Sequence, residues 1–180
     1  MNLLLALVLS QAPEFSAEAS GAYNASLRPA FGGFLGGTAA RKFSDHVGAE
    51  LGVLAGYQAE PYPVFDAYLA GAHSMGATHR LSLLATVGPR FALWRFTLSP
   101  QVLVGWTKVW LDGRFVNERW GIDAPLNETV SAFTLGIAAA VSFRIVERVH
   151  VRARVLVPLP FSSGVTGYVT FTLGAVVDFP

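Results

Sequence analysis

The sequence predicts an all-β protein, an eight-stranded antiparallel up-and-down transmembrane β-barrel. Long segments alternate apolar and polar residues, which places one apolar and one polar face on each strand. Hydrophobic residues make up 52% of the 180-residue chain and charged residues only 14%, yet no run reaches the roughly 18 apolar residues that a membrane helix needs. The connections between the strands also differ in length, as they do in barrels that cross a membrane.

The last strand, residues 165–179, shows the alternation most clearly. Apolar residues or glycine fill its odd positions, and most even positions are polar: Thr166, Tyr168, Thr170, Thr172 and Asp178. The segment is longer than an ordinary strand of about five or six residues. We therefore expect it to close the barrel by pairing with the first strand.

The N-terminal residues 1–19 are predicted to form a signal peptide, which leaves residues 20–180 as the barrel domain. Residues 3–9 are a short apolar run, and Ala17-Glu18-Ala19 is an A-x-A cleavage pattern. We expect cleavage after Ala19, with a cut after Ala12 as the second option. The alternative is a short buried element at the start of a soluble domain.

The alternation places the strands, in order, at residues 20–27, 31–40, 47–57, 79–87, 94–107, 129–145, 149–159 and 165–179. Four glycines blur the faces of the second strand and suggest a bulge or a bend. Pro100 removes a hydrogen-bond donor within the fifth strand and also predicts a bulge or kink.

The connections predict which strand ends lie together. Those at 41–45, 92–93 and 146–148 are short, and those at 60–78 and 112–128 are long. Short turns at one end and long loops at the other are expected of a membrane barrel. The connections near Arg28 and Ser162 are short for the loop end and fit this scheme less well.

The polar face is expected to line the lumen, because it also carries the small residues that a crowded interior needs. The predicted lumen charge network consists of Glu50, Arg80, Arg90, Arg95, Arg144, His150, Arg152, Arg154 and Asp178. Buried charges must be paired, so several guanidinium groups should share Glu50 and Asp178, with Asp178 opposite His150. An ion path or anion site is one interpretation. A salt-bridged plug is favoured, because eight strands leave little room.

The aromatic residues lie near the expected strand ends, where a membrane barrel has its interfacial girdles. The predicted interfacial aromatics are Tyr57, Phe91, Trp94, Trp106, Trp110 and Phe143, with Phe179 at the end of the last strand. Core aromatics of a soluble sandwich are the alternative.

Residues 172–179 carry the sharpest local pattern, a polar residue, a glycine, a hydrophobic residue and an aromatic at Thr172, Gly174, Val177 and Phe179. With the alternation before it, this pattern resembles the small OmpA/OmpX-like outer-membrane barrels. The resemblance implies that these four residues are the signal read by the barrel-insertion machinery. It further implies a monomer in the bacterial outer membrane that contacts its lipid and lipopolysaccharide. The departure is Pro180, which follows the aromatic.

The sequence offers little catalytic chemistry. It has no cysteine and a net charge of +1, and it shows no metal spacing and no phosphate or dinucleotide loop. No metal, cofactor or nucleic-acid partner is therefore expected. His79 and Ser82 lie three residues apart on a strand and point to opposite faces.

The expected function is that of a non-enzymatic outer-membrane barrel. Its loops 60–78 and 112–128 would contact a surface partner or lipopolysaccharide. A lipid-modifying barrel enzyme is one alternative. A secreted, lipocalin-like soluble barrel that binds an apolar ligand is the other, and its apolar face would point inward.

Overall fold

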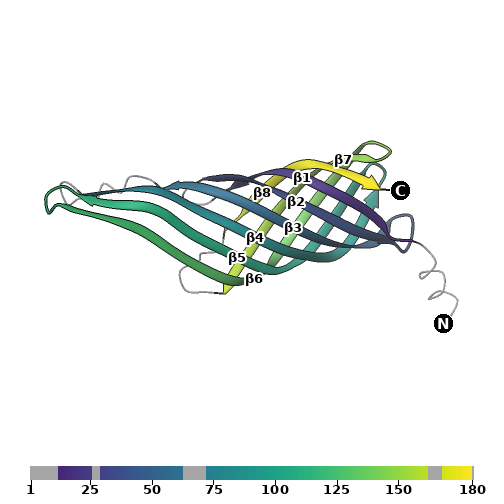
Figure 1. The fold of residues 1–180 in the computed structure, drawn as a ribbon. Helices are drawn as coiled ribbons and strands as arrows, with labels where there is room; N and C mark the ends of the chain where they lie inside the picture. The colour runs from purple at the N-terminus through teal and green to yellow at the C-terminus, as the bar shows by residue number, and fades with distance from the viewer. Residues whose placement is uncertain (1–11, 26–28, 63–71, 162–167, 180) are drawn as a thin grey trace.

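A computed structural model describes residues 12–25, 29–62, 72–161 and 168–179, and of residues 61–62 and 72–75 it describes the backbone alone. These residues form eight strands: β1 (Glu14–Asn24), β2 (Ala30–Lys42), β3 (Val47–Tyr62), β4 (Ala72–Leu93), β5 (Phe96–Asn117), β6 (Ile122–Val146), β7 (Val149–Phe161) and β8 (Thr170–Phe179). Each strand pairs antiparallel with the next, and β8 pairs with β1 to close the barrel (Figure 1). The predicted eight-stranded up-and-down barrel is confirmed.

The apolar faces of the strands point away from the lumen. Large apolar side chains such as Leu35, Ile137 and Leu173 are each more than 60% exposed, whereas Glu50 and Arg152 are buried. Burying apolar surface is the main favourable term in folding, so an outer surface of this kind needs lipid around it. The predicted direction of the faces is confirmed, and the lipocalin-like alternative, which needs the opposite direction, is wrong.

Strand β1 begins at Glu14, six residues before the predicted start at Ser20. Phe15 pairs with Phe179 of β8, and Glu14 pairs with Ala40 of β2. Residues 14–19 alternate as the rest of the strand does, with mostly small residues outside and polar residues inside. An A-x-A cleavage pattern and a strand with small outward residues look the same in sequence.

Three predicted connections differ from the structure. The β4–β5 turn consists of Trp94 and Arg95, because Leu93 pairs with Phe96, so the turn lies two residues after the predicted one. The predicted loop 112–128 is mostly strand, since β5 continues to Asn117 and β6 begins at Ile122. The predicted loop 60–78 is likewise strand at both ends, and its residues 63–71 lie outside the described residues.

At Pro100, where a bulge or kink is predicted, the structure has a gap in pairing with the register unchanged. Val87 pairs with Val102 and Phe91 pairs with Leu98 in one register, while the positions between them, which include Pro89 and Pro100, are unpaired across β4 and β5. Two prolines that stand opposite each other remove two donors at one place. A register shift does occur at the end of β6, between Arg144 and Val146.

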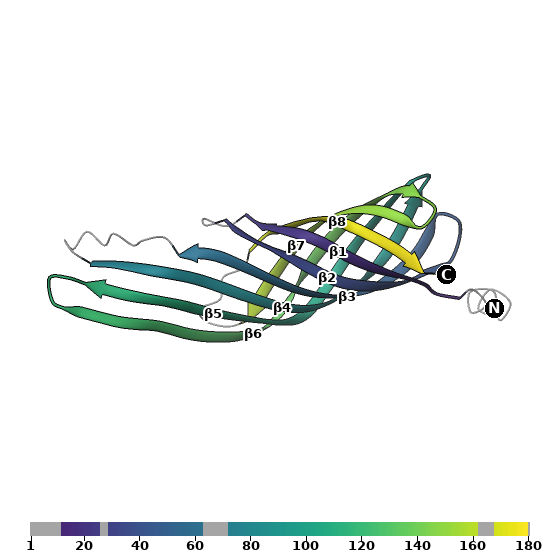
Figure 2. The same cartoon turned by 45° about the horizontal axis from the view of Figure 1, so that its top comes forward.

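The strands differ greatly in length, and this gives the molecule two unlike ends. The β5–β6 hairpin, together with parts of β3 and β4, extends far beyond the other strands (Figures 1 and 2). We call this the projecting end. The opposite end holds the short β2–β3, β4–β5 and β6–β7 turns, the start of β1 and the end of β8, and we call it the short-turn end. None of the described residues forms a helix long and apolar enough to span a membrane.

Candidate functional site

The lumen is divided by an apolar layer that the sequence interpretation missed. Seven strands each contribute one inward side chain to a single cluster of Ala22, Phe34, Leu54, Leu84, Leu103, Ala138 and Leu156. Each of the four leucines is at most 1% exposed. They occupy the predominantly polar faces, where they appear in sequence only as isolated exceptions to the alternation. An eight-stranded barrel has an interior that side chains fill, and this layer does so at mid-height.

Glycines make room for the bulky members of this layer. Phe34 of β2 stands opposite Gly56 of β3, and a Cβ at Gly56 would lie 2.1 Å from Cε1 of the Phe34 ring. A Cβ at Gly36 would likewise lie 2.6 Å from Cδ2 of Leu54. Gly36, one of the glycines that blur the pattern of β2, and Gly56 of β3 are therefore part of how the lumen is packed.

Two glutamates and two arginines form a buried ion-pair network on the short-turn side of the apolar layer. Arg154 of β7 donates two hydrogen bonds to Glu18 of β1, 3.1 Å to Oε1 and 2.9 Å to Oε2. Arg152 of β7 bridges both carboxylates, with Nη1 3.3 Å from Glu18 Oε2 and 3.2 Å from Glu50 Oε1. All four residues are at most 4% exposed. Two positive and two negative charges balance within the lumen.

Neutral polar groups extend this network to other strands. Gln101 Nε2 of β5 donates to Glu50 Oε1 at 3.0 Å, and Arg152 Nε donates to Ser142 Oγ of β6 at 2.8 Å. Buried charges are tolerated only when they are paired and hydrogen-bonded. The network meets this condition with groups from β1, β3, β5, β6 and β7, and it joins strands that are not neighbours.

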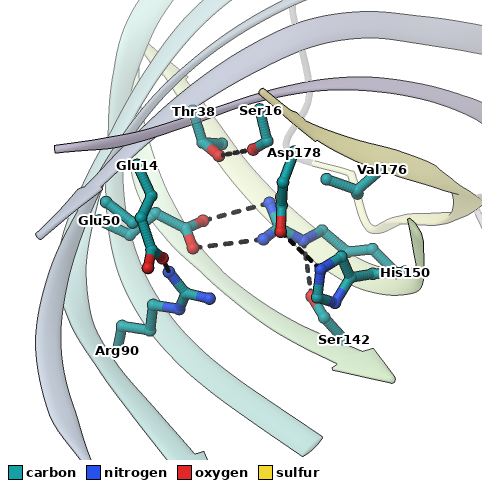
Figure 3. Close-up of a pocket in the computed structure, with 11 residues that line it drawn as sticks. Glu14, Ser16, Thr38, Glu50, Arg90, Ser142, His150, Val176 and Asp178 are labelled. Atoms are coloured by element: carbon teal, nitrogen blue, oxygen red, sulfur yellow. Dashed lines mark hydrogen bonds and ion pairs between the residues drawn. The ribbon is translucent and has the colours of Figure 1, made fainter. Parts of the chain in front are cut away.

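A second set of charged groups lies nearer the short-turn end. Glu14 of β1 forms ion pairs with Lys42 and Arg90, the latter with Nη1 3.1 Å from Oε2. His150 Nε2 lies 2.7 Å from Asp178 Oδ2. Figure 3 shows both the Arg90 and the His150 contacts around one small cavity. The sequence predicts Asp178 directly opposite His150. In the structure the cross-strand partner of His150 is Val176, so the contact with Asp178 is diagonal.

The space inside the lumen is small at this level. The cavity between Glu14, Glu50 and Arg152 measures about 10 Å³, which is no more than one water molecule needs. It widens to a mouth of about 500 Å³ at the short-turn end. The arrangement is that of a filled interior with an open vestibule, which supports the plug interpretation over an ion path.

The remaining predicted lumen arginines lie elsewhere. Arg80 is on the projecting side of the apolar layer, and its guanidinium carbon stacks 3.8 Å from the ring centroid of Tyr168. Arg95 and Arg144 are exposed at the rim of the short-turn end, because the β4–β5 turn and the irregular end of β6 carry them out of the lumen.

Glu14 and Glu18 are the functional-site residues that sequence reasoning missed. Both belong to the segment assigned to the signal peptide. Their inward positions in the 14–24 alternation were the signal that could have found them. They also supply the carboxylates that the predicted network lacked.

The predicted insertion-signal residues all lie on β8. Thr172 is buried and faces the lumen, whereas Val177 and Phe179 are exposed on the outer surface. Gly174 stands opposite Ser20 of β1, and a Cβ there would lie 2.2 Å from the Ala19 carbonyl oxygen. This glycine therefore permits the close seam between the last strand and the first.

The predicted interfacial aromatics fall at two levels on the outer surface. Phe91, Trp94 and Phe143 lie near the short-turn end, where Phe143 packs against Phe96 with ring centroids 5.0 Å apart. Trp106, Tyr57 and Trp110 lie toward the projecting end. Between the last two, His79 stacks with centroids 5.3 Å from Trp110 and 6.0 Å from Tyr57.

The outward residues change from apolar to polar along the long strands. On β5, the unbroken apolar outward series ends at Trp106, and the outward residues that follow are Lys108, Trp110, Asp112, Arg114 and Val116. On β6, Phe133 is the last apolar member, and the outward positions beyond it are Ser131, Thr129, Asn127, Pro125 and Asp123. The ten-residue step from Phe96 to Trp106 spans about 34 Å of strand, or about 26 Å along the barrel axis at a tilt of about 40°. That height equals the apolar band of membrane barrels, about 25 Å.

Beyond that band, the inward residues change from mostly polar to mostly apolar. Half-buried apolar side chains line the inner face of the extended strands: Val109, Leu111, Phe115, Leu126 and Val130. We define the projecting sheet as residues 72–80, 108–117 and 122–132, with the adjoining end of β3. Within the described part of the chain, residues 122–132 of β6 pair only with β5. The other edge of that segment is unpaired there.

This architecture is found in solved structures of outer-membrane proteins. A major outer membrane protein from Thermus thermophilus matches with a TM-score of 0.57 and 18% identity, over 94% of this chain and 100% of that chain. The chain has the fold of the small outer-membrane barrels. Ail, the attachment invasion locus protein of Yersinia pestis, matches this barrel with a TM-score of 0.53 and 16% identity, over 93% of this chain and 97% of that one.

A second structure of Ail, in complex with the heparin analogue sucrose octasulfate, matches the barrel with a TM-score of 0.54 and 15% identity over the same shares of the two chains. No protein-family model matches the sequence. No curated protein matches it significantly. The predicted location in the bacterial outer membrane agrees with the structural matches.

The described residues do not assemble a catalytic relay. His150 and Asp178 are in contact, but Ser142, which lines the same cavity, accepts its hydrogen bond from Arg152. His79 lies on the outer surface with Tyr57 Oη 2.6 Å from Nδ1, and Ser82 faces the lumen. Among the residues that the structure describes, no group of three potential ligands could hold a metal ion.

Proposed function

We propose that this outer-membrane barrel is not an enzyme and that it presents its projecting sheet to a partner outside the cell. The observation that carries the proposal is the change of polarity on the outward faces of β5 and β6 beyond Trp106 and Phe133. A chain that only needed to span the lipid would end its strands near that level. The extra length forms an ordered sheet beyond the lipid band. Short turns in the periplasm and longer connections outside the cell are the usual orientation.

The projecting sheet fits a protein partner better than a polyanion. Its residues 108–130 carry the basic Lys108, Arg114 and Arg119 against the acidic Asp112, Glu118, Asp123 and Glu128, so no positive excess supports a sulfated ligand like the one in the Ail complex. Within the described part of the chain, residues 122–132 of β6 have one unpaired edge, which offers backbone groups to an extended segment. The apolar inner face beside it would supply side-chain contacts.

Lipopolysaccharide is a second candidate partner, and a different feature supports it. The stack of Tyr57, His79 and Trp110 lies on the outer surface just beyond the apolar band, with Lys108 Nζ 6.0 Å from the Trp110 ring centroid. Aromatic rings with a polar edge suit the headgroup level of a membrane. A cationic side chain beside them suits a phosphorylated glycolipid.

The lumen supports a structural role and not a catalytic one. The buried carboxylates and guanidinium groups are paired with one another, and the apolar layer separates them from the projecting end. A catalytic group needs access to substrate and a free position beside it. We therefore propose that the network holds the shape of the barrel.

A shortened chain tests the proposed function. Residues 112–127 would be replaced by Asn-Gly, which joins the paired Leu111 and Glu128 through a favoured hairpin turn. Phage-displayed peptides selected against the full chain in detergent are expected to lose binding to the shortened chain. The shortened chain should keep its heat-modifiable migration on gels, which reports a folded barrel. No enriched peptide, or peptides that bind both forms equally, would contradict the proposal.

A further inference from the structure

The β4–β5 turn holds a tryptophan in an unfavourable backbone conformation. Trp94 has φ of 54° and is 80% exposed. A bulky residue at positive φ is uncommon, because its Cβ crowds the backbone. Such strain persists where the surroundings over-determine it, and it occurs often at functional sites. The barrel leaves most of the ring uncovered, so the ring is open to a partner outside the chain.

Two arginines lie beside Trp94. The Arg95 guanidinium carbon is 5.3 Å from the Trp94 ring centroid, and Arg144 Nη2 donates to the Trp94 carbonyl oxygen at 3.5 Å. The Arg144 backbone N–H also bonds the Arg95 carbonyl at 2.9 Å, which holds the two residues on adjacent hairpins together. Neither guanidinium forms an ion pair with a carboxylate of the described residues, and the nearby Glu147 forms none within that part of the chain.

A recess of about 360 Å³ is lined by Trp94, Arg95, Arg144, Ile145, Val146 and Glu147. Ile145 and Val146 are each more than half exposed. The recess lies at the short-turn end, next to Phe96 and Phe143, which pack together on the outer surface. From the lipid band toward water, the outer surface therefore changes from apolar side chains to the tryptophan ring and then to the guanidinium groups.

We propose that this recess binds the headgroup of an anionic phospholipid of the periplasmic leaflet. The phosphate would lie between the Arg95 and Arg144 guanidinium groups, which can each donate two hydrogen bonds to phosphate oxygens. The Trp94 ring would contact the glycerol region, and the acyl chains would follow Phe96 and Phe143. The proposal rests on the proposed function, which places the short-turn end in the periplasm. The site lies at the opposite end of the barrel from the projecting sheet.

Native mass spectrometry of the full chain, released from a neutral detergent, tests this proposal. Phosphatidylglycerol and phosphatidylcholine with the same acyl chains would be added separately. The wild type is expected to prefer phosphatidylglycerol. The R95Q/R144Q variant should bind it roughly tenfold more weakly, with phosphatidylcholine binding unchanged. The matched control is R114Q/R119Q, which removes the same charge from the projecting sheet and should bind as the wild type does.

Three outcomes of this experiment would overturn the proposal. The wild type binds both lipids equally, or the control loses as much binding as R95Q/R144Q, or a tenfold molar excess of inorganic phosphate displaces the lipid. Displacement would assign the recess to free phosphate. Heat-modifiable migration of the same samples reports a folded barrel. A failed lipid preference in a folded barrel counts against this site alone, whereas the proposed function fails only if the projecting sheet has no partner.

A second variant separates lipid binding from barrel packing. Glycine adopts positive φ without strain, so Trp94→Gly is expected to raise the unfolding midpoint in neutral detergent and to weaken phosphatidylglycerol binding severalfold. A lower midpoint would show that Trp94 stabilises the barrel, and undiminished lipid binding would show that the ring is not part of the site. Either result contradicts the assignment of Trp94.

Discussion

At the scale of single residues, the decisive feature is the pairing of Glu18 with Arg154 inside the lumen. Both side chains are almost fully buried, and two hydrogen bonds join their charged groups. Each charge is therefore neutralised mainly by the other. A buried ion pair adds little net stability over an apolar pair, because both charges lose their hydration. Removing one partner is costly, because the other charge stays buried.

Glu18→Gln is therefore expected to lower the free energy of unfolding by about 3 kcal/mol, since it leaves Arg154 without its carboxylate. Urea titration of the folded chain in lipid vesicles measures this change. Glu118→Gln, at the exposed tip of the β5–β6 hairpin, is the control and should leave the midpoint unchanged. Equal midpoints for Glu18→Gln and the wild type would show that the ion-pair network does not stabilise the barrel.

Sequence alone predicts only part of this network. Glu50, Arg152 and Arg154 follow from their inward positions in long alternating strands. Glu18 does not, because a cleavage pattern covers the same residues. The leucines at 54, 84, 103 and 156 were missed for another reason. A filled lumen needs apolar side chains as well as paired charges, and an apolar residue on a polar face looks like an irregularity.

At the scale of elements, the start of β1 matters most. Glu14 and Glu18 lie on it, and Phe15 pairs with Phe179 of the closing strand. Cleavage after Ala19 would remove six residues of β1, most of which pair with both neighbouring strands. We propose that the mature chain retains Glu14, as a cut after Ala12 would allow.

The intact mass of the protein purified from outer membranes tests this proposal. The expected mass is that of a chain whose first residue precedes Glu14. The mass of a chain that starts at Ser20 would show that the barrel closes without Glu18. Arg154 would then need another carboxylate in the lumen.

The strand predictions succeeded within the lipid band and failed beyond it, for a physical reason. Inside the band, lipid requires apolar outward residues and the lumen accepts polar ones, so the alternation marks each strand. Beyond Trp106 on β5 and Phe133 on β6, the outward residues become mostly polar, as an outer face in water requires. The segments then look like polar loops in sequence, although they remain paired strands.

At the scale of the whole molecule, the barrel has three parts with different roles. The lumen is filled, and we propose that it fixes the shape. An apolar outer band meets the lipid, and a projecting sheet extends from one end. The two candidate binding features lie outside the lumen, at opposite ends. The proposed roles of the two ends depend on the direction in which this molecule crosses the membrane.

Single-cysteine labelling in intact cells tests that direction and the position of the band, and the chain contains no native cysteine. Cysteine would replace Asn127 in the projecting sheet, Ile137 in the band or Glu147 in the β6–β7 turn. A membrane-impermeant maleimide is expected to label position 127 in intact cells, position 147 only after the outer membrane is permeabilised, and position 137 in neither state. Labelling of position 147 but not 127 in intact cells would contradict the account.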